Sequence, residues 1–413
     1  MNILIINQFA DNKGDRAVLH VLLKMIQGMR PDASITVSTT RPEAWQQTKI
    51  PEGKNPVSFV HWSAPRRFPL LPRRVVSVLF RRLLYPSIVN AVLDDRKMPA
   101  HAGFLLDGGF VKALKKADIV ISTGGHHFTN WFAKDGIAAL FLDLALAVLL
   151  NKPTYIWSQT LGPLTFSKAQ NQRFLIKTLE ACRQLYVRDR ISHQALKDVG
   201  MSSERVVDTL ESVFALKTAN VGTISQRPMR VGIAIYTGPN RNTMDFTRYV
   251  QDLACYAKYA VAKGYEVLFF PMQIKDQSGD DRPRIQEIIK AADAGDSVRI
   301  LDADLDTDEH VSEVAKCRIF VAHKTHAVVF ALCTGTPTIG IAYHPKATDF
   351  MALYGQEYRC IAEAELSLDW LKERHEESEQ RGDELHSHQM EITRSLRERI
   401  NEDFRRIIEA RPN

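Results

Sequence analysis

Residues 319–342 read IFVAHKTHAVVFALCTGTPTIGIA and contain a complete strand–helix–strand unit. The apolar run Ile319–Ala322 and the β-branched run Thr338–Ala342 each predict a short strand. Between them, residues 325–334 predict an apolar helix that ends at the Gly335-Thr336-Pro337 turn. Because two strands joined through a helix lie parallel in one sheet, this stretch predicts an α/β fold.

The same alternation of strands and helices runs through most of the chain. Other predicted strands are 3–6, 35–38, 119–122, 154–158, 185–187, 206–207, 230–236, 266–270 and 298–301. Other predicted helices are 16–29, 137–150, 169–182, 191–199, 246–263, 283–292 and 309–316. We therefore expect parallel sheets with helices on both faces.

A polar segment ending in proline, residues 217–228, divides the alternation into two halves and predicts a linker. The expected domains are 1–216 and 229–380, both Rossmann-like and doubly wound, facing across a cleft where a ligand binds. A final segment, 381–413, has an apolar stripe at every fourth position: Ile392, Leu396, Ile400, Phe404 and Ile408. This stripe predicts a helix that packs one face against the body of the protein.

Composition excludes several classes of protein. The chain has 413 residues, of which 45% are apolar, so it is neither disordered nor a coiled coil. A formal charge of +6 does not call for nucleic acid as a partner. The first strand follows no basic segment, and the five cysteines are widely spaced, so we expect a cytoplasmic protein without disulfides.

The sequence also lacks the usual signatures of metal and cofactor enzymes. It has no P-loop, no G-x-G-x-x-G, no G-x-S-x-G and no H-E-x-x-H. Alternating acids resemble a calcium loop: Asp302, Asp304, Asp306, Asp308, then Glu313. Its sixth place is Thr307, where glycine is needed, so we expect these acids to cap a helix instead. The histidines have no carboxylate at ligand spacing, and we expect no metal and no cofactor.

Four predicted strand ends carry glycine or polar residues suited to a ligand. They are Asn12-Lys13-Gly14-Asp15, the segment 122–129 with Gly124, Gly125 and His126, the segment 158–163 with Gln159 and Gly162, and His323-Lys324-Thr325-His326 followed by Tyr343-His344-Pro345-Lys346. In the last, a helix N-terminus, a lysine and an imidazole suit a phosphate or carboxylate beside a proton-transfer group. Two alternatives stay open: Asp15 as a plain helix cap and His326 as a hydrogen-bonded core histidine.

With these motifs in this order, the chain resembles the polysaccharide pyruvyl transferase family almost from end to end. The matching segments are Asn12–Asp15, Ser122–Gly125, Gln159–Pro163, Arg188-Asp189 with Ser192, and Lys324 to Lys346. The family's Arg-x-His has Lys324 in place of arginine here, preceded by His323 where a small residue is usual. Lysine neutralises an anion as a point charge but does not grip it with two parallel bonds.

The resemblance implies a glycosyltransferase-B-like fold and a metal-independent reaction. Pyruvate moves from phosphoenolpyruvate onto a sugar of a polysaccharide or its lipid-linked precursor, as a cyclic ketal. By the resemblance His326 is the acid–base group, and the donor-binding residues are Lys324, Lys346, Arg188, His323 and Tyr343. The remaining residues serve the acceptor or the loops, on the N-terminal domain: Asn12, Gly14, Asp15, Gly124, Gly125, His126, Gln159 and Gly162.

Positive charge is concentrated in one stretch. Between Pro65 and Lys97 lie eight cations, Arg66, Arg67, Arg73, Arg74, Arg81, Arg82, Arg96 and Lys97, and only two acids, Asp94 and Asp95. In a helix, four of these arginines lie opposite an apolar side made by Val75, Val76, Leu79, Leu83 and Leu84. This pattern suits docking at the anionic inner face of the plasma membrane. The alternative is an ordinary amphipathic helix with solvated arginines.

Two other functions compete with the pyruvyl transferase. One is a nucleotide-sugar-dependent glycosyltransferase of the same architecture, for which the second domain carries no distinct nucleotide signature. The other is a catalytically inactive binding relative, suggested by Lys324 at the arginine position.

Overall fold

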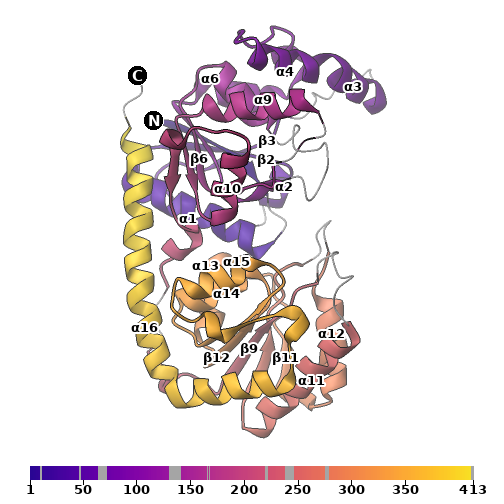
Figure 1. The fold of residues 1–413 in the computed structure, drawn as a ribbon, viewed down its shortest axis with the longest axis vertical. Coiled ribbons are helices and arrows are strands. Elements are labelled where there is room, and N and C mark those ends of the chain that lie inside the picture. Colours follow the sequence, from indigo (N-terminus) through magenta and orange to yellow (C-terminus); the bar gives the residue numbers. More distant parts are fainter. Residues whose placement is uncertain are drawn as a thin grey trace. The chain divides into compact units, whose positions relative to one another are not determined.

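In the computed structural model the chain forms two compact units (Figure 1). The structure describes residues 1–9, 12–45, 48–63, 72–129, 141–164, 166, 168–218, 222–237, 246–274 and 279–410, except for the side chains of 73, 77, 127 and 203. Unit 1 consists of Met1–Ala10, Val18–Ser212 and Arg399–Asn413, and unit 2 of Asp11–Ala17 and Val213–Glu398. The units therefore differ from the expected domains at both ends of the chain, because 11–17 group with unit 2 and 399–413 with unit 1.

Unit 1 is built on a parallel sheet in the order β3-β2-β1-β4-β6-β7-β8, with β5 paired to β6. Its strands are β1 (Asn2–Gln8), β2 (Ser34–Thr39), β3 (Ser58–His61), β4 (Ile119–Ser122), β5 (Gly125–Phe128), β6 (Thr154–Leu161), β7 (Gln184–Val187) and β8 (Val206–Asp208). Ile5 pairs with Val37 on one side and Ile121 on the other, and all three are buried. Burial on both faces explains the continuous β-branched runs.

Helices flank this sheet, as expected for a doubly wound unit. They are α1 (Lys13–Met29), α2 (Pro42–Trp45), α3 (Arg73–Leu79), the π-helix η1 (Phe80–Leu84), α4 (Tyr85–Leu93), α5 (Ala102–Leu105), α6 (Gly108–Lys116), α8 (Leu142–Leu149), α9 (Ala169–Glu180) and α10 (Arg190–Asp198). Side-chain caps begin α6 and α10: Asp107 accepts from the Gly109 and Phe110 amides, and Asp189 accepts from the Ser192 amide. Part of the predicted helix 137–150 lies outside the described residues.

Two predictions for unit 1 were wrong in detail. The strand predicted to end at Ser158 continues to Leu161, past a register shift and a left-handed Ser158 (φ 50°). The Gly-Gly segment after β4 forms the short strand β5, not only a turn. Both differences arise because β5 and the end of β6 pair with each other, a contact that local sequence does not reveal.

Unit 2 repeats the architecture with the order β11-β10-β9-β12-β13-β14, all parallel. The strands are β9 (Arg230–Ala234), β10 (Glu266–Phe269), β11 (Val298–Ile300), β12 (Ile319–Ala322), β13 (Thr338–Ala342) and β14 (Cys360–Ala362). Phe269, Ile233, Val321 and Ile339 pair in one row across four strands, and each is fully buried. This is the Rossmann-like strand order, and the predicted fold class is confirmed.

The helices of unit 2 lie around this sheet. They are α11 (Phe246–Ala262), α12 (Arg282–Ala292), α13 (Thr307–Ala315), α14 (Thr325–Cys333), α15 (Pro345–Ala352) and most of α16 (Leu368–Glu409). The aspartate run caps α13: Asp306 accepts from the Glu309 amide (2.8 Å), and Glu309 accepts from the Asp306 amide (3.0 Å). Within the described residues, no group of three or more histidine, cysteine or acidic side chains is placed to hold a metal ion.

The C-terminal helix is longer than predicted and bent. Helix α16 begins at Leu368 and changes direction at Arg381, whose backbone (φ −117°, ψ 15°) is not helical (Figure 1). The predicted start of the packing helix, residue 381, therefore falls at the bend. Of its apolar stripe, Ile400, Phe404 and Ile408 are buried. Ile392 and Leu396 are half-buried.

Candidate functional site

The proposed acid–base histidine lies at the start of α14 in unit 2. Strand β12 ends at Ala322, and Lys324 is the N-cap with an extended backbone (φ −86°, ψ 138°). The Ala327 amide donates to the Lys324 carbonyl (2.9 Å), which sets the first turn. His326 is half-buried in that turn, where the helix N-terminus favours negative charge.

Gly14 packs directly against the His326 imidazole. A Cβ atom added to Gly14 would lie 2.2 Å from His326 Nδ1, so no larger residue fits without moving the ring. The Lys13 amide donates to the Met272 carbonyl (3.0 Å), which holds this first turn of α1 in unit 2. The Asn-x-Gly-Asp motif and the histidine motif therefore form one site.

Asn12 and Asp15 cap α1 with reciprocal hydrogen bonds. The Asp15 amide donates to Asn12 Oδ1 (2.8 Å), and Asn12 Nδ2 donates to Asp15 Oδ2 (2.8 Å). Asn12 is therefore the residue whose side chain caps α1, and Asp15, in the first turn, accepts from the Asn12 side chain. A contact of either residue with an acceptor sugar stays a prediction.

Lys13, which sequence reasoning did not select, anchors the same turn. Its ammonium donates to Asp304 and to the Leu305 carbonyl, and Arg16 also bonds Asp304 (3.0 Å). Burial lowers the pKa of Lys13 below its ordinary value, against the opposing effect of Asp304. This link ties the start of α1 to the segment before α13.

Lys324, at the position of the family's arginine, is engaged by a buried carboxylate. Its ammonium donates to Asp281 (2.9 and 3.0 Å) and to Gln273 Oε1 (2.6 Å). Asp281 is fully buried and also accepts from the Met272 and Gln273 amides (2.9 Å each). The geometry supports a role for Lys324 in fixing the β12–α14 junction, while its contact with the donor stays a prediction.

His323 is fully buried between a carboxylate and a phenol. Its Nε2 lies 3.1 Å from Glu363 Oε2, and its Nδ1 lies 2.7 Å from the Tyr249 hydroxyl. Because a carboxylate accepts, we assign the proton to Nε2, so that Nδ1 accepts from Tyr249. His323 thus has a fixed tautomer beneath the surface of the site.

Two tyrosines stack above His323. The rings of Tyr236 and Tyr343 are 3.8 Å apart and nearly parallel (8°), and His323 meets both edge-on at 5.7 and 5.9 Å. Tyr343 is 39% exposed, and its hydroxyl lies 3.3 Å from Thr325 Oγ1. Tyr236 was missed by sequence reasoning, although it lies just beyond β9, at the same sheet edge as the predicted residues.

The last predicted residues of unit 2 begin α15. His344 is its N-cap, and His344 Nδ1 accepts from the Lys346 amide (3.2 Å). Lys346 is 6% exposed. Two helix N-termini, those of α14 and α15, therefore lie at the carboxyl edge of adjacent strands, β12 and β13.

The other predicted residues lie in unit 1, along β4–β6 and β7. Ser122 links Asn7 Nδ2 (3.0 Å) to Gln159 Oε1 (3.2 Å), and Gln159 Nε2 is buried with no hydrogen-bond partner among the residues that the structure describes. His126 Nε2 lies 2.7 Å from the Gly162 carbonyl, and Gly124 packs against the Ser158 carbonyl. Gly125 pairs with Gln159 across β5 and β6.

Arg188 is buried in unit 1 and bonded to an acid. Its guanidinium pairs with Glu211, with side chains 4% and 1% exposed, and its Nε donates to Thr160 Oγ1 (3.1 Å). The buried Glu211 carboxylate thus neutralises the charge of Arg188. Its predicted contact with phosphoenolpyruvate is not tested by this geometry.

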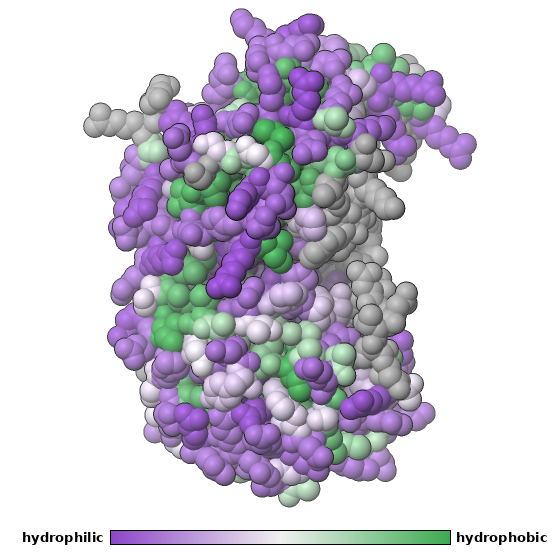
Figure 2. Space-filling view, viewed as in Figure 1, coloured by the Kyte–Doolittle hydropathy of each residue, from purple (hydrophilic) through white to green (hydrophobic). Residues whose placement is uncertain are grey.

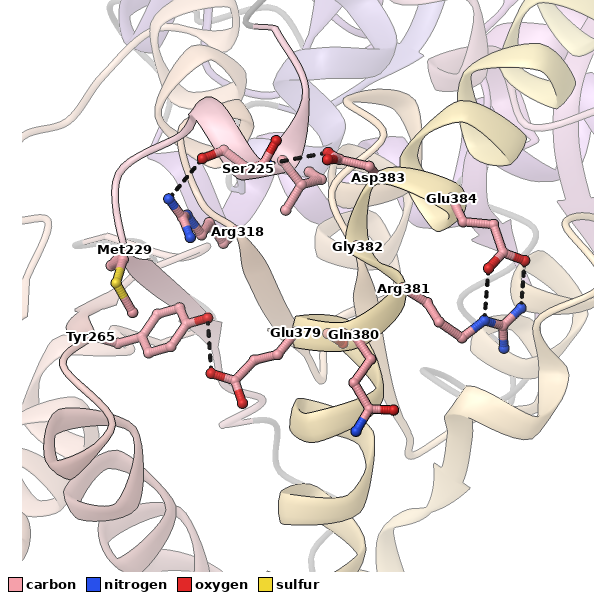
Figure 3. Close-up of a pocket in the computed structure, with 12 residues that line it drawn as sticks. Ser225, Met229, Tyr265, Arg318, Glu379, Gln380, Arg381, Gly382, Asp383 and Glu384 are labelled. Carbon is pink, nitrogen blue, oxygen red and sulfur yellow. Dashed lines mark hydrogen bonds and ion pairs between the residues drawn. The ribbon is translucent and has the colours of Figure 1, made fainter.

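A separate pocket of about 360 Å³ lies at the bend of α16 (Figure 3). Its polar groups bond one another: Ser225 bridges Arg318 (2.9 Å) and Asp383 (3.1 Å), and Tyr265 donates to Glu379 (3.4 Å). None of the predicted site residues lines it. We assign it to the packing of the bent helix.

Two Rossmann-like sheets with polar residues at the carboxyl edges of their strands define an α/β class of protein in which ligands bind at those edges. The chain matches the family model "Polysaccharide pyruvyl transferase" over residues 12–345, and it belongs to this family. The match begins at the Asn12 motif and ends in the Tyr343–Lys346 segment, so it includes every predicted site residue except Lys346.

Solved structures of sugar-nucleotide proteins share the fold at low identity. HepE from Anabaena, in complex with UDP and glucose, is 13% identical, covers 99% of each chain and has a TM-score of 0.56. UDP-GlcNAc 2-epimerase from Methanocaldococcus jannaschii is 9% identical, with 91% and 92% coverage and a TM-score of 0.54. The Neisseria meningitidis epimerase bound to UDP-GlcNAc is 10% identical, with 99% and 100% coverage and a TM-score of 0.54.

Proposed function

We propose that this protein transfers pyruvate from phosphoenolpyruvate to a saccharide as a cyclic ketal, without a metal or cofactor. The vinyl CH₂ of the donor takes a proton and becomes a methyl group, and one sugar hydroxyl attacks the cationic C2. The second hydroxyl then bonds the same carbon as the C–O bond to phosphate breaks. The proton of one sugar hydroxyl returns to the acid–base group that protonated the CH₂. The proton of the other hydroxyl leaves with the phosphate.

The observation that carries this proposal is His326 at the α14 N-terminus, positioned by Gly14, in a member of the pyruvyl transferase family. Protonation of carbon needs one acid–base group held in a fixed place. The donor carries a carboxylate and a phosphate, which suit the N-termini of α14 and α15 and the ammonium of Lys346. We assign proton delivery to His326 and donor binding to these groups.

Phosphate release from phosphoenolpyruvate tests the reaction, with a panel of model glycosides and lipid-linked saccharides. We expect acceptor-dependent release, reduced about 10²–10⁴-fold in His326→Gln. The control is His61→Gln, an exposed histidine at the end of β3. A wild-type protein that releases no phosphate with any acceptor but binds UDP would favour a nucleotide-sugar glycosyltransferase instead. Full activity in His326→Gln would refute the assignment of the proton donor.

We also propose that the protein works in the cytoplasm, at the inner face of the plasma membrane. Val75, Val78 and Leu83 are 43, 50 and 55% exposed, and Arg74, Arg81 and Arg82 are exposed beside them. Figure 1 shows α3 extending outward from unit 1, and Figure 2 shows hydrophobic and hydrophilic residues side by side there. Exposed apolar and cationic side chains together suit an anionic lipid surface.

The same helices carry a hydrophobic stretch, Arg74–Leu93, which is long and apolar enough to span a membrane by length and composition alone. The predicted apolar side is only partly exposed, since Val76 and Leu84 are buried. Arg66 and Arg67 lie outside the described residues, as does the side chain of Arg73. The support for surface docking therefore rests on residues 74–83.

Flotation with liposomes tests this location. Vesicles with anionic phospholipid should carry the wild-type protein upward, while neutral vesicles should not. Arg81→Glu/Arg82→Glu should abolish flotation, and the control Lys115→Glu/Lys116→Glu, on exposed positions of α6, should not. Equal flotation of both variants, or none of the wild type, would contradict membrane docking.

A further inference from the structure

The stacked pair Tyr236 and Tyr343 forms an aromatic surface beside the proposed acid–base histidine. The two residues follow β9 and β13, which lie on either side of β12, the strand that leads to His326. Tyr236 covers one face of the Tyr343 ring, yet 39% of Tyr343 stays exposed. Leaving a large aromatic ring exposed to water costs free energy. Exposed aromatic rings at the edge of a site therefore commonly contact a ligand.

The pair is held rigidly from beneath. His323 is fully buried, contacts both rings edge-on, and is itself fixed by Glu363 (3.1 Å) and Tyr249 (2.7 Å). The Tyr343 hydroxyl reaches Thr325 Oγ1 (3.3 Å), in the residue immediately before His326. A binding surface supported in this way loses little entropy when a ligand arrives.

The bonds of a cyclic ketal constrain the position of the acceptor sugar relative to the donor. Both sugar oxygens bond to C2 of the pyruvate, so the sugar carbons that bear them lie only two bonds from the donor carbon. If His326 protonates the donor in unit 2, the acceptor ring must contact unit 2 as well. Of the residues that the resemblance implies for the acceptor or the loops, Asn12, Gly14 and Asp15 lie in unit 2, whereas the Gly124–Gly162 group lies in unit 1.

We infer that Tyr236 and Tyr343 are the subsite for the acceptor's pyranose ring, whose C–H face packs on the exposed tyrosine while its hydroxyls face the donor. This inference rests on the proposed function, since it uses the position of the donor carbon. The flat ring supplies apolar contact, and the hydroxyls of Tyr343 and Thr325 supply hydrogen bonds to the sugar. It moves Tyr343, with His323 as its positioning residue, from the donor binding that the resemblance implies to acceptor binding, and it adds Tyr236 to the subsite.

Steady-state kinetics of Tyr343→Ala test the subsite. We expect the KM for the acceptor to rise at least tenfold while the KM for phosphoenolpyruvate stays within about twofold. Tyr343→Phe keeps the ring and should retain acceptor KM within about threefold. The matched control is Tyr358→Ala, which removes a 47% exposed tyrosine of the same unit outside the site. An unchanged acceptor KM in Tyr343→Ala would overturn the inference.

Calorimetric binding of the model glycoside, without phosphoenolpyruvate, separates the inference from the proposed function. If the wild type binds the glycoside but shows no turnover, and Tyr343→Ala abolishes this binding, the proposed reaction is refuted and the subsite is supported. Turnover with Tyr343-independent glycoside binding would refute the subsite alone. If uridine diphosphate binds in a Tyr343-dependent way and the glycoside does not, the surface takes a nucleobase and the inference fails. Thermal unfolding of each variant confirms that it is folded.

Discussion

At the scale of single residues, Gly14 decides where the imidazole of His326 lies. The two are at opposite ends of the matched family region, and the space between them does not admit a methyl group. Geometry at a catalytic group is sensitive, since a displacement of about 1 Å can lower the rate about 10²-fold. If His326 is the acid–base group, as we propose, the glycine of the N-terminal motif supports catalysis although it offers no side chain.

Gly14→Ala should lower kcat about 10²-fold by displacing His326. The matched control is Gly28→Ala in the same helix, where a Cβ meets nothing within 4 Å. Gly28→Ala should keep full activity and stabilise the protein by about 0.5–1 kcal/mol, because alanine restricts the unfolded chain. Phosphate-release kinetics and urea unfolding of both variants check these outcomes. Equal activity of the two would show that His326 adjusts freely.

The buried pair of Lys324 and Asp281 gives a second prediction. Lys324→Met leaves the Asp281 carboxylate buried without its cation, and should cost about 3–5 kcal/mol of unfolding free energy. In the double variant Lys324→Met/Asp281→Asn the uncompensated charge is gone, and part of the loss should return. Denaturant titration of the two variants and the wild type measures the difference. A Lys324→Met protein of unchanged stability would mean that Lys324 is not a structural cation.

At the scale of elements, α16 covers unit 2 with a histidine that burial keeps neutral. His375 is fully buried among Tyr256, Tyr259 and Tyr265, with its Nδ1 3.0 Å from the Tyr256 hydroxyl. Burial lowers the pKa of His375 to about 4, although Glu379 at 3.8 Å opposes the shift. The unfolded chain therefore binds a proton more readily than the folded protein.

Because the pKa of His375 is lower in the folded protein than in the unfolded chain, the free energy of unfolding should fall on acidification. Between pH 7.5 and pH 5, an unfolded histidine of pKa about 6.5 becomes charged while the folded one does not, which costs about 2 kcal/mol. The loss sets in as the pH falls below about 6.5 and is complete near pH 4. His375→Asn, which can still meet Tyr256, should show a smaller loss over the same range than the wild type. Urea unfolding at the two pH values measures both slopes, and equal slopes would exclude His375 as a source.

Most elements could be predicted because their residues are apolar on a clear period. The β12–α14–β13 unit was predicted to within one residue, since buried parallel strands need continuous β-branched runs. The three-residue strand β14 and the helix α15 were missed, because short elements depend on tertiary pairing more than on local pattern. The bend of α16 was also missed, although Gly382 directly follows Arg381 and glycine weakens a helix where it bends.

The candidate site was predicted less completely than the fold. His326, Lys324 and Tyr343 follow strands directly, and the rule for carboxyl edges finds such residues. Asp281 and Glu363 were missed because an acid gives no sign of which buried cation or imidazole it meets. The contact between Gly14 and His326 is equally invisible, since it joins segments far apart in the chain.

At the scale of the whole molecule, the position of the positive charge along the chain tells more about membrane binding than the net charge does. The excess of positive charge is matched by one stretch around α3, so membrane attachment and catalysis are expected to depend on different residues. The variants Arg81→Glu/Arg82→Glu should therefore lose flotation while keeping turnover of a water-soluble glycoside. Kinetics in detergent-free buffer check this separation, and a parallel loss of turnover would tie α3 to the active site.

The grouping of residues 11–17 with unit 2 has a consequence for the gene. The segment that supports the histidine is encoded near the start, whereas the rest of that unit is encoded after residue 212. During synthesis these few residues leave the ribosome long before the helix they support. A fragment cloned as 213–398 would therefore lack the glycine that packs against its histidine. Any scheme that recombines halves between relatives must carry both coding segments together.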